Sequence, residues 1–344
     1  MKQAPTAAAL ALPLALTLAL AGLPAQAQDK PVQLRMSTWV PAQHPLNPAL
    51  QAWADDIKKA SGGTISATLF PSEQLGKAFD HYDMVRDGMA DLAYISPGYQ
   101  PGRFPIIGGA ALPFLFSTAK GGTAALDSWY RQYAPAEMKD IKVCMAFVHD
   151  PGTLHSVRKI TLPGDIRGMK VRPATSTVGQ VVTALGGTNV QASASESRDM
   201  LERGVADAIT FPWASIALFG IDKVTKYHLD VPLYTTPYIW GMNKAKYAAM
   251  SPAQKKVIDE HCTTAWAEKV AGPWTDYEYG GRARTAAQPG HTIVKLTPAQ
   301  LQQWRTAVAP AESAWAASVK KTGQDPAAVM AGLKQALASY KAGF

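Results

Sequence analysis

The residues in this sequence best suited to chemistry are an arginine and several aromatic side chains at the ends of strand-like segments. In the segment from Asp165 to Pro173, a turn at Gly168 leads into a short strand. Side chains alternate between the faces of a strand, so Arg172 ends this strand on the face opposite to Val171. A guanidinium there offers a rigid planar fork that matches a carboxylate. The alternative is a surface arginine paired with an acidic neighbour, which spacing alone favours.

Aromatic side chains gather at other strand ends. The segment 207–213 ends in Phe211 and Trp213 around a proline, and it can wall a pocket with flat surfaces. Trp39 ends the first strand, and Tyr238 lies in the β-prone stretch 234–242. The competing interpretation is ordinary packing, because aromatic residues also dominate protein cores. Their place at strand ends rather than on helix faces favours a lined cleft.

Sequence motifs of catalysis are missing. The chain has no Gly-x-Ser-x-Gly elbow, no His-Glu-x-x-His pair and no Gly-x-x-x-x-Gly-Lys-Ser/Thr loop. The seven histidines are dispersed, and the one close pair, His149 and His155, has no cluster of carboxylates or thiols around it to complete a metal site. We therefore predict a protein that is not an enzyme and has no cofactor or metal. A hydrolase of another architecture stays open, because a missing motif is only moderate evidence.

The N-terminus predicts export to the periplasm. Lys2 precedes an apolar run at 7–23, which is followed by the small-residue cleavage pattern of Ala25 and Ala27. These features are typical of a secretory signal peptide over residues 1–27. A retained membrane anchor is the alternative, although the run is at the short limit for a span, which needs about 20 residues.

Charge and cysteine content narrow the partners and the compartment. The net charge of +8 is scattered along the chain, whereas nucleic-acid binders usually carry a basic stripe with interleaved aromatics, so no nucleic-acid partner is predicted. The two cysteines, Cys144 and Cys262, lie far apart in unlike contexts. A disulfide and two buried thiols are equally compatible with that pattern.

Alternating strand-like and helix-like segments predict an α/β fold. The strands at 34–40, 64–70 and 92–95 are separated by helices at 46–59 and 77–89, which implies parallel strands joined by crossovers. The segment 97–116 is rich in proline and glycine and predicts loop and extended chain.

A turn at 149–152 and the stretch 234–242 predict two hinge crossovers between lobes. The predicted boundaries are a first lobe at 28–150, a second lobe at 151–238, a return to the first lobe with a connecting helix at 239–280, and C-terminal helices packing on the second lobe at 281–344. In such a two-lobed binding-protein fold, the cleft between the lobes is the expected ligand site.

Seven segments, in order, resemble one family, the DctP-type substrate-binding proteins of tripartite ATP-independent periplasmic (TRAP) transporters. They are residues 34–39 with His44 and Pro45, 86–93, 112–116, 165–173, 184–187, 202–208 and 242–244. Each segment alone is weak, but seven in the right order are specific. The likeness covers essentially the whole chain after the predicted signal peptide.

The resemblance implies a periplasmic protein that closes on a small organic acid, a mono- or dicarboxylate, and delivers it to the TRAP membrane permease subunits. In the family, the arginine of the Gly-x-Lys-x-Arg segment pairs with the substrate carboxylate, and that residue is Arg172 here. Positions matching Phe211, Trp213 and Thr236 surround the ligand. The resemblance thus overrides the surface interpretation that spacing alone favours.

One departure from the family pattern narrows the classes of organic acid that are expected as the ligand. Relatives that bind sialic acid carry a second arginine after the first crossover, where this chain has Leu154, so sialic acid is not expected. His149, beside the crossover, is predicted to donate to a ligand oxygen or to serve the hinge. Two other functions stay open, namely a binding protein for an ATP-driven (ABC) importer or a sensor kinase, and a periplasmic enzyme acting on an organic acid.

Overall fold

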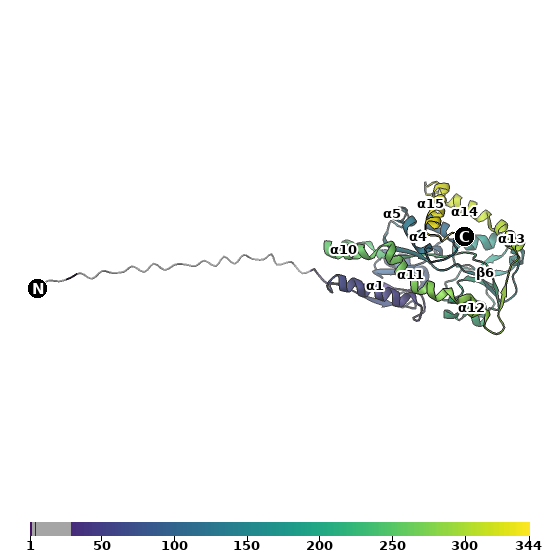
Figure 1. Ribbon diagram of the computed structural model, residues 1–344, viewed down its shortest axis with the longest axis horizontal. Coiled ribbons are helices and arrows are strands. Elements are labelled where there is room, and N and C mark those ends of the chain that lie inside the picture. Colours follow the sequence, from purple (N-terminus) through teal and green to yellow (C-terminus); the bar gives the residue numbers. More distant parts are fainter. Residues whose placement is uncertain (2–3, 5–28) are drawn as a thin grey trace.

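The computed structural model describes residues 1, 4 and 29–344 (Figure 1). Residues 2–3 and 5–28, most of the predicted signal peptide, lie outside the described residues. Among the described residues, no helix combines the length and apolar character that crossing a bilayer requires.

The first of two sheets has the strand order β2-β1-β3-β10-β4. Its strands are β1 (Val32–Ser37), β2 (Ile65–Phe70), β3 (Leu92–Ile95), β4 (Ile141–Val148) and β10 (Pro237–Asn243). β1 is parallel to β2 and β3, whereas β10 is antiparallel to β3 and β4. The crossover helix α1 (Leu46–Ala60) buries Leu46, Leu50, Trp53 and Ile57, a spacing that places them on one face.

The second sheet has the order β11-β9-β5-β8-β6-β7. Its strands are β5 (Thr153–Ser156), β6 (Lys170–Arg172), β7 (Thr188–Asn189), β8 (Ala208–Phe211), β9 (Tyr227–Leu229) and β11 (Thr292–Val294). The short helices around these sheets are α2 (His81–Arg86), α4 (Gly122–Tyr130), α5 (Ala134–Glu137), α6 (Ser176–Ala184), α7 (Ser197–Glu202), α8 (Ser215–Leu218), α9 (Lys244–Ala248) and α12 (Gly281–Ala286).

Two chain segments connect the sheets side by side. One leads from β4 to β5 and the other from β9 to β10. They are joined where the Gly152 N–H donates to the Tyr234 carbonyl (2.8 Å) and the Leu233 N–H donates to the Gly152 carbonyl (3.0 Å). A side chain on Gly152 would collide with the Phe211 backbone and the Tyr234 ring, so the close approach of the two segments depends on this glycine.

The proline-rich segment differs from its prediction. Residues 97–116 were expected to be loop and extended chain, but they contain the helical turns η2 (Pro97–Tyr99), α3 (Pro105–Gly108) and η3 (Gly109–Ala111). Pro97 and Pro105 each stand at a first helical position, where the missing N–H costs nothing and the fixed φ favours a helix.

The C-terminal third is helical, as predicted. It comprises α10 (Pro252–His261), α11 (Thr264–Tyr279), α13 (Pro298–Val308), α14 (Pro310–Lys320) and α15 (Pro326–Ser339). The last helices, predicted to pack on the second lobe, contact both sides. α14 packs on α6 beside the second sheet and also on α3, and α15 packs on α4 beside the first sheet. In Figure 1, α11 runs between the region of α1 and α10 and that of α12.

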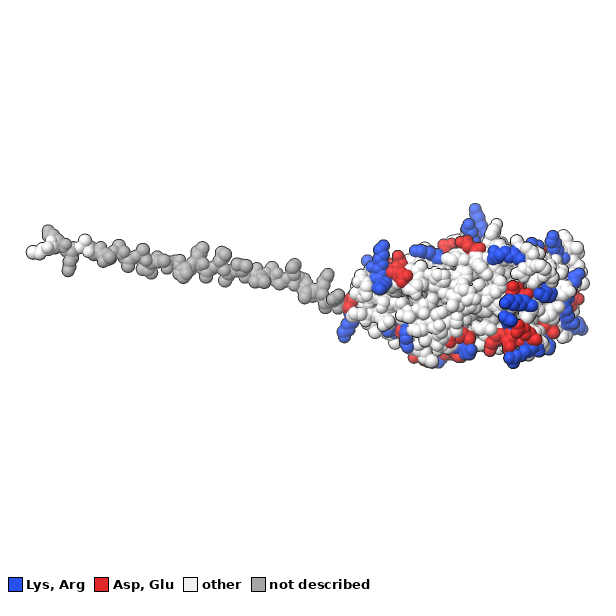
Figure 2. Space-filling view, turned by 90° about the horizontal axis from the view of Figure 1, so that it is seen from below, with Lys and Arg blue, Asp and Glu red and all other residues white. Residues whose placement is uncertain are grey.

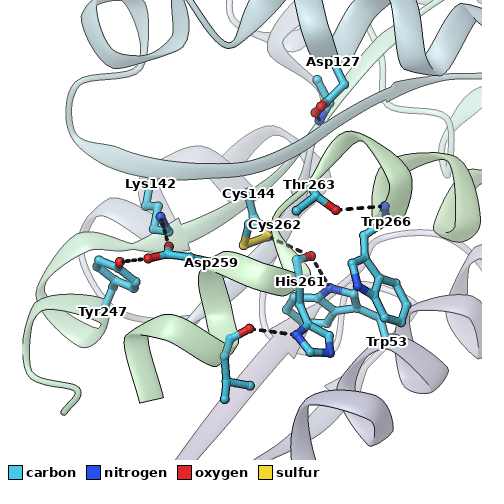
Figure 3. Close-up of a disulfide and its surroundings, with 12 residues drawn as sticks. Trp53, Asp127, Lys142, Cys144, Tyr247, Asp259, His261, Cys262, Thr263 and Trp266 are labelled. Atoms are coloured by element: carbon cyan, nitrogen blue, oxygen red, sulfur yellow. Dashed lines mark hydrogen bonds and ion pairs between the residues drawn. A yellow bond between two sulfur atoms is a disulfide. The ribbon is translucent and has the colours of Figure 1, made fainter. Parts of the chain in front are cut away.

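The open question of the cysteines is answered by a disulfide. Cys144 on β4 and Cys262 at the end of α10 are bonded (Figure 3). The bridge lies beside Trp53, whose indole N–H donates to the His261 carbonyl (2.8 Å). It therefore ties the sheet strand β4 to the helices that cover the same sheet.

Candidate binding cavity

A small cavity lies where residues from both sheets and from α11 meet. Its volume is about 20 Å³, which is room for roughly one water. Its lining residues are Trp39, Val40, His44, Tyr99, His149, Arg172, Ala174, Ala194, Phe211, Pro212, Ser215, Phe219, Tyr234, Thr236, Tyr238 and Trp274. Six of the seven predicted site residues are among them. Because the cavity is nearly closed, a larger molecule reaches it only when the walls separate.

Arg172 is the cation of this cavity. It ends β6 as predicted, and its side chain is only 1% exposed. Nε donates to the Ala192 carbonyl (2.9 Å) and Nη2 donates to the Tyr99 hydroxyl (3.1 Å). Among the described residues, no carboxylate lies within ion-pair distance of it. A buried charge without a counter-charge is costly, so this guanidinium is poised for an anion.

Two tyrosine hydroxyls add uncommitted donors. The Tyr99 oxygen accepts from Arg172 and from the Ala194 N–H (2.9 Å). Both of its lone pairs are thus used, and its own hydrogen remains available. The Tyr234 hydroxyl is buried without a hydrogen-bond partner among the described residues. Buried hydroxyls are normally paired, so both groups point to an acceptor that the protein does not supply.

Aromatic rings form most of the remaining wall. Trp39 stacks on Tyr94 with ring centroids 4.9 Å apart, and it packs against Tyr238 at 6.1 Å. On the side of the second sheet, Phe211 meets Phe219 edge to face at 5.2 Å. The cavity thus combines one cation with flat apolar surfaces.

His149 and Thr236 line the cavity but are occupied with each other. His149 Nδ1 donates to the Asp150 carbonyl (2.5 Å), and Nε2 accepts from the Thr236 N–H (3.1 Å). Burial lowers the pKa of His149 to about 4, so its ring is neutral. With both ring nitrogens engaged, His149 has no N–H left for a ligand, and its contacts serve the crossover between the sheets.

Trp213 lies outside the cavity, against the prediction that it walls the pocket. Its ring packs edge to face on His155 at 5.3 Å. The prediction was that two aromatics around a proline at the end of a strand wall one pocket. β8 ends at Phe211 and the chain turns at once, so Trp213 lies beyond the strand end, beside His155.

Several cavity residues could not be singled out from the sequence. Trp274 lies on α11, where an aromatic residue indicates helix packing, and Tyr99 lies in the proline-rich segment. Phe219 and Ser215 follow the turn after β8. Of the lining residues that were not predicted, only His44 had a signal in the sequence, because it stands in the first of the family-like segments. Among the described residues, no three metal-ligating side chains gather into a site for an ion.

The surface has mixed charge. On the face in Figure 2, Lys and Arg side chains lie among Asp and Glu side chains around a largely uncharged centre. On this face, therefore, the net positive charge of the chain is not gathered into one stripe.

Comparisons with known proteins agree with this geometry. Residues 36–318 match the family described as bacterial extracellular solute-binding protein, family 7 (DctP). A TRAP solute binding protein of Rhodoferax ferrireducens T118 with copurified benzoate has a TM-score of 0.84 and 27% identity, covering 90% of this chain and 98% of that one. A marine metagenome TRAP protein specific for aromatic acid ligands, with 3-hydroxybenzoate, has a TM-score of 0.84 and 31% identity, covering 90% and 99%.

A third similar structure is a TRAP periplasmic solute binding protein of Bordetella bronchiseptica with bound (R)- and (S)-mandelate. Its TM-score is 0.83 and its identity 27%, covering 90% of this chain and 99% of that one. These likenesses confirm the predicted two-lobed α/β fold.

Proposed function

The chain belongs to family 7 of the bacterial extracellular solute-binding proteins, the TRAP substrate-binding proteins that its motifs resemble, and we propose that it captures an aromatic monocarboxylate. The observation that carries this proposal is the buried Arg172, which has no carboxylate within ion-pair distance in the described part of the chain, in a cavity walled by aromatic rings. The ligand carboxylate accepts from the guanidinium and from the hydroxyls of Tyr99 and Tyr234. Its ring lies against Trp39 and Phe211.

The charge of the cavity favours one carboxylate over two. Arg172 is the cation among the residues that line it. The other titratable bases there are neutral, because burial lowers the pKa of His44 to about 3 and that of His149 to about 4. A second carboxylate would be buried without a counter-charge, which is costly. The similar proteins that hold benzoate, 3-hydroxybenzoate and mandelate support the same class.

Transport follows from closure in the periplasm. The N-terminal export pattern supports a periplasmic location, and the family supports delivery to a TRAP permease driven by an ion gradient. The elements around the two sheets act as the lobes, and the paired segments at Gly152 and Tyr234 act as the hinge. Separation of the lobes opens the nearly closed cavity, and the bound acid closes it again.

The proposal is tested by calorimetry and thermal unfolding with benzoate, its neutral counterpart benzamide, and succinate. We expect benzoate to stabilise the protein, by about 2.7 kcal/mol at a hundredfold excess over its dissociation constant. Benzamide lacks the charge that Arg172 requires, so it should not bind measurably, and succinate should bind more weakly. The acid should be recovered unchanged after incubation. Binding of succinate but of no aromatic acid, or turnover of the acid, would refute the proposal.

A further inference from the structure

His44 is a rigidly held histidine that faces the same cavity. It lies between β1 and α1, where its backbone N–H donates to the Pro41 carbonyl (2.9 Å) and its carbonyl accepts from the Asn47 N–H (3.0 Å). Its side chain is 1% exposed and lines the cavity. Its position is therefore fixed by the loop and not by a ligand.

The hydrogen bonds of His44 determine which ring nitrogen carries the proton. The Leu46 N–H donates to Nδ1 (3.2 Å), so Nδ1 has no hydrogen. Burial lowers the pKa of His44 to about 3, so the ring is neutral and its one proton lies on Nε2. Among the described residues, Nε2 has no hydrogen-bond partner. It is also absent from the fully buried polar atoms without a partner, so it keeps some exposed surface. The Nε2–H is therefore an unused donor on a residue that lines the cavity.

His44 and Arg172 line the same cavity and are linked by contacts between aromatic side chains. Its ring contacts Trp274 at 4.9 Å and Phe219 at 6.5 Å. Phe219 packs on Phe211, and the Arg172 guanidinium lies over the Phe211 ring. On the other side, the Trp274 ring packs on Tyr238, and Tyr238 packs on Trp39. Trp39 packs on Tyr99, whose hydroxyl accepts a hydrogen bond from Arg172. Aromatic residues therefore separate the two polar groups on both sides, and a ring held at its carboxylate by Arg172 extends towards His44.

We infer that the His44 Nε2–H is a second recognition point, which binds an oxygen substituent on the ring and makes a hydroxylated aromatic acid the preferred ligand. The inference rests on the proposed function, because Arg172 must hold the carboxylate. An unsubstituted acid would leave this donor unpaired in a closed cavity, and a site built to bind a hydroxyl discriminates against the analogue that lacks it. The similar protein that holds 3-hydroxybenzoate is consistent with this ligand class.

The test compares dissociation constants for benzoate and for 2-, 3- and 4-hydroxybenzoate. In the wild-type protein, at least one hydroxylated acid should bind about tenfold more tightly than benzoate. His44→Asn keeps an oxygen that can accept from the Leu46 N–H but removes the Nε2 donor. We expect it to reduce the preference to within about twofold, because the donor that the hydroxyl pairs with, and that benzoate leaves unpaired, is gone. His44→Gln places an amide N–H near the Nε2 position and should retain part of the preference.

The outcomes separate this inference from the function on which it rests. If the wild-type protein binds no aromatic acid, the proposed function fails, and the inference fails with it. If it binds benzoate and all hydroxybenzoates equally, or if His44→Asn keeps the preference, only the inference fails. Should the variants not fold, the Nε2–H resonance of His44 in the wild-type protein decides. It should move further downfield with the preferred hydroxybenzoate than with benzoate, because only the former accepts its hydrogen bond, and equal shifts overturn the inference.

Discussion

The two sides of the cavity differ in how complete they are without a ligand. On the side of the first sheet, Trp39 stacks on Tyr94, its indole N–H donates to the Tyr94 carbonyl (3.0 Å), and Tyr94 in turn stacks on Phe147. On the side of the second sheet, Arg172 is buried and, among the described residues, has no carboxylate within ion-pair distance, although its charge helps to lower the pKa of Glu196 after the hydrogen bonds from Ser193. Both sides hold a buried tyrosine hydroxyl without a partner among the described residues, Tyr94 on the first and Tyr234 on the second, but only the second side also holds a buried guanidinium.

This difference assigns separate tasks to the two lobes. Under the proposed function, the second lobe would determine whether an anion binds at all, because its guanidinium supplies the charge. The first lobe would determine which anion binds, because its rings and His44 shape the space around the rest of the ligand. Variants on the two sides should therefore fail in different ways.

The largest effect is expected at Arg172. Arg172→Ala should lose benzoate binding beyond a hundredfold, because removing one partner of a buried ion pair costs roughly 3–5 kcal/mol. Arg172→Lys should retain little, since an ammonium lacks the planar fork. Calorimetry measures both, with Arg282→Ala as control, because Arg282 already pairs with Asp230 (2.6 Å). Binding by Arg172→Ala within threefold of the wild type would contradict the division between the lobes.

A smaller loss is expected on the aromatic side. Trp39→Ala removes a ring that the ligand packs against, and we expect affinity to fall about tenfold to thirtyfold through lost apolar contact. Trp213→Ala is the matched control, because Trp213 packs on His155 outside the cavity. It should lower the melting temperature but leave the dissociation constant within about twofold. Equal losses of affinity in both variants would contradict the placement of Trp39 against the ligand and of Trp213 away from it.

How far the sequence predicts the site depends on how local each signal is. Arg172 is predictable, because alternation within one short strand and a family-like segment place it at a strand end. Trp213 does not line the cavity, because the chain turns after Phe211 and a strand pattern does not report where a side chain beyond the strand end points. Tyr99 and Trp274 come to the cavity from segments distant in the chain, and no local periodicity reports such contacts.

The fold shows the same division. The strand at 92–95 has the predicted bounds, because it is a short buried run between clear breaks. The disulfide stayed undecided, because pairing of cysteines 118 positions apart depends on the packing of β4 against α10. Proline content alone did not distinguish loop from helical turns in 97–116.

The smallest predicted effect concerns a buried carboxylate behind the cavity wall. Glu278, on α11, accepts from the backbone N–H groups of Ala214 (2.5 Å) and Ser215 (3.0 Å) and from the Trp274 indole N–H (3.1 Å). Burial raises the pKa of Glu278 to about 7, against hydrogen bonds that lower it. Ser215 and Trp274 line the cavity, so this carboxylate joins the wall on the second side to the helix of the first.

A bound anion should raise the pKa of Glu278 further, because like charges disfavour each other's charged forms. Binding then takes up a proton, so affinity for benzoate should be higher at pH 6 than at pH 8, by roughly twofold to fivefold. His44 and His149, with pKa values of about 3 and 4, stay neutral over this range. The acid ligand is fully ionised throughout, so its own titration does not contribute.

Calorimetry from pH 6 to pH 8 measures the dissociation constant of benzoate and tests whether it depends on the protonation of Glu278. Glu278→Gln cannot titrate, so its dissociation constant should not vary with pH. Glu137→Gln is the control, because Glu137 likewise accepts from two backbone N–H groups, those of Ile106 (2.5 Å) and Ile107 (3.1 Å), but does not line the cavity or its wall. It should keep the wild-type slope. A wild-type affinity that does not change with pH, or a slope that persists in Glu278→Gln, would mean that the ligand does not sense the charge on Glu278.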